Sequence, residues 1–175
     1  MMIELSVIRD VVAIFGVIAG FSYYVIMVRN QNRTRQAQLF NQMWSWTIPP
    51  GVFEEHIELL NWDWTDYDDF EHKYGSDNNP AAFAKRMRIY GILDGIGTHV
   101  KEGLLNVSLT QSAALIAVFQ WYKWKNIIEE QRKRYYAPLW LQNWEYYVNE
   151  VLKYWEKMGY PYTPPETLSK YIPDQ

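Results

Sequence analysis

The sequence predicts an all-α protein, with one N-terminal transmembrane helix followed by a cytoplasmic helical bundle. Three observations lead to this fold class. Residues Val11–Val28 form an uncharged apolar run, VVAIFGVIAGFSYYVIMV. The rest of the chain repeatedly places apolar residues at helical spacing between helix caps and Gly or Pro breaks. No segment shows the alternating pattern of a half-buried strand.

The apolar run has the length of a membrane span. At ~1.5 Å per helical residue it extends about 27 Å, close to the hydrocarbon thickness of a bilayer. A secretory signal peptide would carry its positive charges before the apolar run, whereas here three arginines follow it. A core helix of a soluble protein is the other alternative, but such a helix rarely lacks a polar stripe over this length.

The arginines also predict an orientation. Arg29, Arg33 and Arg35 follow the span at a basic membrane junction, and only Arg9 precedes it. Because positive flanks remain in the cytoplasm, residues 1–10 are expected outside and the C-terminal part inside. Within the span, Gly16 and Gly20 form a G-x-x-x-G pair, which permits close helix–helix packing and suggests self-association.

The segment after the span is polar and helical. Residues 29–48 are expected to continue the membrane helix as a basic juxtamembrane helix as far as Trp46, and its apolar side is expected to comprise Leu39, Phe40, Met43 and Trp46. Pro49-Pro50-Gly51 then breaks the helix, and residues 49–175 form the helical domain.

Six helices are expected in this domain, five longer ones and a short last one, each from local signals. Residues 51–60 form an amphipathic helix whose apolar face comprises Phe53, His56, Ile57 and Leu60. A T-x-x-D spacing at 65–68 opens the next helix, and Asn79-Pro80 caps a helix that ends at Gly103. Ser108–Gln111 opens a long helix whose apolar run 113–119 is too short to be a second span. Pro138 starts the last long helix, and residues 163–166 cap a final short one.

The stretch GILDGIG, residues 91–97, is the most distinctive candidate site. Each glycine destabilises a helix by up to about 1 kcal/mol relative to alanine, so the cluster needs a compensating reason. Close packing of Gly91 and Gly95 against a large aromatic side chain is one explanation. The alternative is a ligand-binding pocket floored by Gly91 and Gly95 and lined by Asp94.

No residue cluster specifies catalysis or a cofactor. The chain has no Cys, which excludes thiol nucleophiles and cysteine-based metal sites. Asp68 and His72 lie one helical turn apart and suggest a carboxylate–histidine metal site, but two ligands do not define one, and we expect no metal.

Charge is segregated along the chain. Residues 54–77 carry nine acidic residues against one lysine, and residues 123–134 carry five basic residues against two acidic ones. These segments either face each other or are separately solvated, or the basic Trp-bearing helix meets anionic lipid headgroups. The net charge of −3 argues against a nucleic-acid partner.

A family resemblance accompanies these patterns. The order of the membrane helix, the arginine-rich junction, DYDDFEHKYGSDNNPAAFAKRMRIYGILDGIGTHVKEGLL and the Trp-rich FQWYKWKNIIEEQRKRYY resembles an uncharacterised family of small archaeal and bacterial single-pass membrane proteins. The resemblance implies a membrane anchor with a small helical domain and supplies no catalytic residues.

The sequence therefore favours a membrane-anchored, non-catalytic interaction or accessory protein. Its partners are the lipid bilayer and either a protein partner or a second copy of itself, bound through the Trp- and Tyr-rich domain. A membrane-tethered small-ligand sensor is the alternative, and a carboxylate–histidine metalloenzyme is less favoured.

Overall fold

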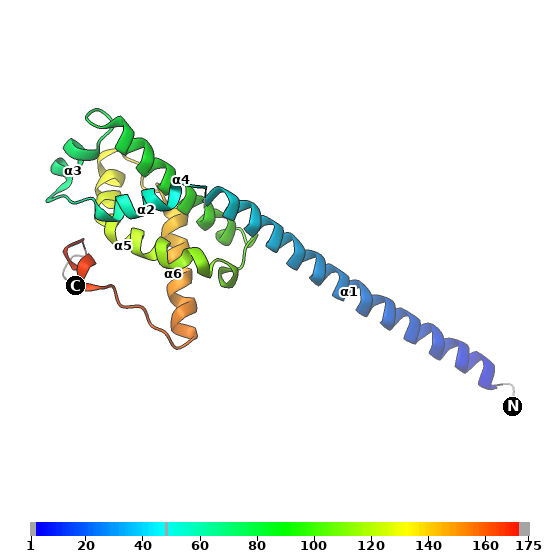
Figure 1. The fold of residues 1–175 in the computed structure, drawn as a ribbon. Helices are drawn as coiled ribbons and strands as arrows, with labels where there is room; N and C mark the ends of the chain where they lie inside the picture. The colour runs from blue at the N-terminus through cyan, green and yellow to red at the C-terminus, as the bar shows by residue number, and fades with distance from the viewer. Residues whose placement is uncertain (1–2, 48, 172–175) are drawn as a thin grey trace. The chain divides into compact units, whose positions relative to one another are not determined.

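The computed structural model describes residues 3–47, 49–171 of the chain, and these residues are all-helical, with six α-helices, two short 3-10 helices and no strand. Two compact units are present, Met1–Gln38 and Leu39–Gln175. The predicted fold class is confirmed, and Figure 1 labels the helices in chain order.

Helix α1 spans Ile3–Thr47 without a break, which confirms that the membrane-type helix continues past its arginines. It contains an 18-residue window with a mean hydropathy of 2.3, and none of that window is buried. The helix is therefore long and apolar enough to cross a membrane. Arg29, Arg33 and Arg35 are exposed beyond the apolar run, and nothing lies within 4 Å of a Cβ placed on Gly16 or Gly20.

The last turns of α1 belong to the C-terminal unit. Met43 is buried in the core, and Leu39 and Phe40 pack against it, as the sequence predicted. The side chain of Trp46, predicted on the same face, lies outside the described residues.

Helix α2, Val52–Asn61, buries a different face from the predicted one. Its buried residues are Val52, His56 and Leu59, while Phe53 and Ile57 are 56% and 46% exposed. The prediction was therefore wrong for Phe53 and Ile57. The buried set still follows helical spacing, but it begins one residue earlier.

Helices α3 and α4 begin and end at local signals. Helix α3, Tyr67–Tyr74, begins at Asp66, whose side chain accepts from the Asp69 amide, one residue after the predicted Thr65, and Gly75 ends it. Helix α4, Pro80–Lys101, begins as predicted, with the Asn79 side chain accepting from the Ala82 amide.

Helices α5 and α6 both begin later than the sequence predicted. The 3-10 helix η1, Val107–Leu109, comes first, and α5 spans Gln111–Arg134. Helix α6 spans Gln142–Lys157, four residues after the predicted start at Pro138.

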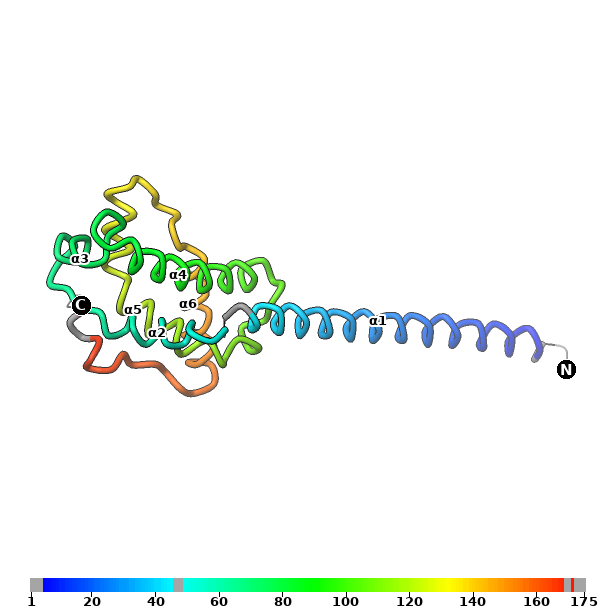
Figure 2. The backbone as a smooth tube through the Cα atoms, turned by 45° about the horizontal axis from the view of Figure 1, so that its top comes forward, coloured from blue at the N-terminus to red at the C-terminus, as the bar shows by residue number. Residues whose placement is uncertain are grey.

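The core is built from α4, α5 and α6, with α4 packing most extensively on α6. Its largest fully buried aromatic side chains are Trp124, Trp144, Tyr90, Tyr147 and Phe70. Figure 2 shows the chain after α6 running back along this unit, and the final 3-10 helix η2, Glu166–Tyr171, contacts α5. This return brings Tyr171 to the candidate site.

Candidate functional site

A buried lysine lies at the centre of the candidate site. Lys123 on α5 is 2% exposed, and its ammonium group donates to the carbonyl oxygens of Leu60, at 2.6 Å, and Trp62. Both carbonyls belong to the C-terminal end of α2, where a positive charge is favoured by the helix dipole. Lys123 therefore caps α2 from another helix.

Aromatic rings surround this ammonium group. The Lys123 Nζ atom lies 5.0 Å from the centroid of the Trp64 ring and 4.6 Å from that of Tyr171. Trp64 in turn stacks on Trp124 at 4.7 Å. Cation–π contacts of this kind offset part of the hydration energy that the ammonium group loses on burial.

The alternative that this basic, Trp-bearing helix contacts lipid headgroups does not fit the part of α5 that carries its tryptophans. Trp121, Lys123 and Trp124 are all buried. Beyond them, Arg134 pairs with Asp68 of the acidic segment at 3.1 Å, so the two oppositely charged segments face each other at this point.

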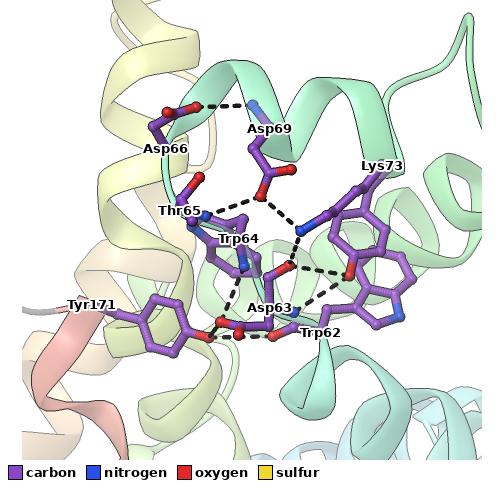
Figure 3. A network of polar contacts seen from close by, with 9 residues as sticks. Trp62, Asp63, Trp64, Thr65, Asp66, Asp69, Lys73 and Tyr171 are labelled. Carbon is purple, nitrogen blue, oxygen red and sulfur yellow. Dashed lines mark hydrogen bonds and ion pairs between the residues drawn. The ribbon is translucent and has the colours of Figure 1, made fainter.

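The loop between α2 and α3 is fixed by a polar network (Figure 3). The Tyr171 hydroxyl lies 3.1 Å from an Asp63 carboxylate oxygen and 3.3 Å from the Trp62 carbonyl oxygen, and it can donate its proton to either. Lys73 donates to the Asp63 carbonyl oxygen at 3.3 Å and to Asp69 at 2.7 Å. The neighbouring helix α3 and the distant residue Tyr171 thus hold this loop in one conformation.

A cleft of about 560 Å³ shares lining residues with this network. We call it the aromatic cleft; its lining residues include Trp64, Tyr67, Lys123, Arg134 and Tyr171. The Arg134 guanidinium lies 4.2 Å from the Tyr67 ring centroid and pairs with Glu130 at 2.9 Å. Burial raises the pKa of Tyr67, so its hydroxyl stays protonated at neutral pH and can donate a hydrogen bond.

An exposed apolar segment adjoins the cleft. We call residues 135–141, with the sequence YYAPLWL, the apolar loop. Tyr136 is 92% exposed and Leu139 66% exposed. The Tyr135 hydroxyl lies 3.5 Å from that of Tyr67, which lines the cleft, so the two features form one continuous surface.

The apolar loop is held in place although Tyr135, Tyr136, Pro138 and Leu139 are exposed. Tyr136 and Leu141 have φ values of 52° and 56°, which non-glycine residues rarely adopt. Arg132 donates to the Trp140 carbonyl oxygen at 2.8 Å and also pairs with Glu145 at 2.8 Å. Backbone strain of this kind persists only where the surroundings enforce it, and it is common at functional sites.

Asp94, predicted to line a pocket, contacts the start of α6. Its carboxylate accepts from the backbone amides of Asn143, at 3.0 Å, and Trp144, at 2.9 Å. The residue before α6, Leu141, makes no side-chain capping bond of its own. Asp94 therefore serves as the N-cap of α6 from a distant position in the chain.

The packing explanation of Gly91 and Gly95 is wrong. Nothing lies within 4 Å of a Cβ placed on Gly91 or Gly95, whereas one placed on Gly97 would collide with the Asn143 carbonyl group. Gly97 is therefore the residue that permits close contact between α4 and α6. The proposed ligand contact of Gly91, Asp94 and Gly95 remains a prediction, although Asp94 already has hydrogen-bond partners.

Among the described residues, no group of three or more His, Asp or Glu side chains is placed to share a metal ion. His72 and Asp68 are exposed, and Asp68 pairs with Arg134. Sequence reasoning missed the buried Lys123, the contribution of Tyr171 and the apolar loop. Only the loop had a usable signal, the uninterrupted run YYAPLWL between two helices.

Comparison with known proteins finds no matching family model, no matching curated protein and no matching solved structure.

Proposed function

We propose that this protein is a membrane-anchored, non-catalytic interaction protein. Helix α1 is its single-pass anchor, with the N-terminus outside and the C-terminal domain in the cytoplasm. The apolar window of α1 supports the anchor, because exposed apolar side chains on every side of a long helix are stable in lipid and unfavourable in water. The arginines after the window support the orientation.

The observation that carries the interaction role is the continuous surface formed by the aromatic cleft and the apolar loop. Tyrosine, tryptophan and arginine dominate the binding energy of protein–protein interfaces, and Trp64, Tyr67, Tyr136 and Arg134 lie on this surface. A pre-ordered loop also loses little conformational entropy on binding. The surface thus suits a protein partner, with a second copy of this chain as the other candidate.

The anchor can be tested by cysteine labelling, because the chain has no cysteine of its own. Single cysteines would replace Ser6, before the apolar run, and Ser108, an exposed residue of the domain. In intact cells a membrane-impermeant maleimide should label the Ser6→Cys protein and spare the Ser108→Cys protein until the membrane is permeabilised. The opposite pattern would refute the orientation, and recovery of the protein in the soluble fraction would refute the anchor.

The interaction surface can be tested by site-specific photo-crosslinking in cells. A benzoylphenylalanine at Tyr136 should give one discrete adduct, and the same probe at Asn149, an exposed position of α6, should give none. The adduct mass distinguishes a second copy from another protein. Equal labelling at both positions would contradict a specific surface.

A further inference from the structure

A second hollow, distinct from the aromatic cleft, lies within the C-terminal unit. It is a cavity of about 220 Å³ lined by Trp44, Phe53, His56, Leu93, Ser112, Ala113 and Ile116. The end of α1 and helices α2, α4 and α5 all contribute to it. Hydrocarbon groups dominate its wall, and His56 is the one titratable residue among those that line it.

Hydrogen bonds fix which nitrogen of His56 carries the proton. The Trp124 indole N–H, which can only donate, donates to the Gln120 side-chain oxygen at 2.6 Å. The amide nitrogen of Gln120 therefore faces His56, where it donates to the His56 carbonyl oxygen at 3.0 Å and lies 3.4 Å from Nδ1. Nδ1 accepts in this arrangement, so the proton of the neutral ring resides on Nε2.

His56 is neutral at physiological pH. It is only 4% exposed, and burial lowers its pKa to about 4, against a smaller opposing effect of the Glu55 carboxylate. The ring therefore offers a hydrogen-bond donor without a positive charge. Such a group selects an uncharged acceptor oxygen over a carboxylate or phosphate.

We propose that this cavity binds a small, neutral, largely apolar molecule whose single carbonyl-type oxygen accepts a hydrogen bond from His56 Nε2. An apolar cavity of about 150 Å³ holds benzene, so this larger one suits a ring with a short substituent, about ten non-hydrogen atoms in all. The exposed Ser112 places one side of the lining at the surface, where such a molecule can enter. The site shares no residue with the aromatic cleft and stands independently of partner binding.

The test uses full-length protein in lipid nanodiscs and two probes of equal size, 4-fluoroacetophenone and 4-fluorocumene, which differ in the carbonyl oxygen. Fluorine NMR should detect saturable binding of the ketone, about five- to tenfold tighter than that of the hydrocarbon, as expected for one hydrogen bond. Partition of either probe into lipid rises linearly and does not saturate. Equal affinity for the two probes would overturn the assignment of His56 as donor.

Matched variants locate the binding. Ala113→Leu fills the cavity and should abolish saturable binding, whereas Ala84→Leu, at an exposed position of α4, should leave it unchanged. His56→Phe should retain binding but remove the preference for the ketone. If Ala113→Leu fails to fold, Ile116→Trp fills the same space from a half-buried position. Two results would overturn the proposal. One is probe uptake by the wild-type sample that rises linearly without saturating, and the other is undiminished binding in a folded cavity-filling variant.

Discussion

Helices α1 and α5 are the two longest helices of the chain, and both carry a continuous apolar run. The run is exposed in α1 and largely buried in α5. In α1, Phe15, Val17 and Phe21 are each more than two-thirds exposed. In α5, Ala114, Ala117 and Val118 are fully buried against other helices. Apolar content alone therefore does not separate a membrane helix from a core helix. The difference lies in whether the rest of the chain supplies a partner.

The polar residues of α5 make the same point. Gln120 and Lys123 interrupt its apolar run, yet they are 0% and 2% exposed. Each is satisfied by groups more than 60 residues away in the chain, at His56 and at the end of α2. The apolar run Val11–Val28 of α1 carries no charged residue, and lipid offers no partner for one.

The sharpest test places the same charge in both helices. Val118→Arg buries an unpaired guanidinium in the core and should destabilise the domain by about 4 kcal/mol or more. Val17→Arg should leave the domain unchanged and weaken membrane insertion by about 3 kcal/mol. Thermal unfolding followed by near-UV circular dichroism reports the first effect, and carbonate extraction of membranes the second. A lower unfolding temperature for Val17→Arg would show that α1 packs within the protein.

A pH effect should be confined to the domain. The pKa of His56 is about 4 in the folded protein and about 6.5 when unfolded, so the unfolded chain binds more protons between these values. The free energy of unfolding is then undiminished above pH ~6.5 and falls as the pH drops toward 4, by up to about 3 kcal/mol.

Denaturant unfolding at pH 7.5 and pH 5 measures this effect. His56→Asn, which keeps an acceptor for Gln120, should flatten the dependence, whereas His72→Asn, at an exposed position, should leave it as in the wild type. A steep dependence that survives His56→Asn would assign the titration to another group.

Features encoded by neighbouring residues were predictable from the sequence, and features created by distant contacts were not. The start of α4 at Asn79-Pro80 and the continuous α1 follow from local signals. The start of α6 does not, because its cap, Asp94, lies 49 residues before Asn143. The same holds for the candidate site, since nothing near Lys123 or Tyr171 in the sequence shows that the fold brings them together.

The glycines extend the comparison to backbone contacts. Gly97→Ala would place a methyl group against the backbone of α6, so α4 and α6 must separate, and we expect a loss of about 2 kcal/mol. Gly95→Ala meets no atom within 4 Å and should stabilise the domain by up to about 1 kcal/mol through helix propensity. Thermal unfolding of both variants measures the contrast. Equal destabilisation by the two would mean that α4 packs on another face.

The smallest expected destabilisation concerns Asp94. Asp94→Ala removes the carboxylate that accepts from the Asn143 and Trp144 amides and should destabilise the domain by about 1–2 kcal/mol. Asp94→Asn should lose less, because its amide oxygen can still accept one of these bonds. Hydrogen exchange should speed up at Asn143 and Trp144 and remain unchanged in the apolar window of α1.

Asp66→Ala is the matched control, since it removes the cap of α3 and should speed exchange at Asp69 instead. Unchanged exchange at the start of α6 in Asp94→Ala would show that the carboxylate does not cap this helix, and Asp94 would then be available to contact a ligand.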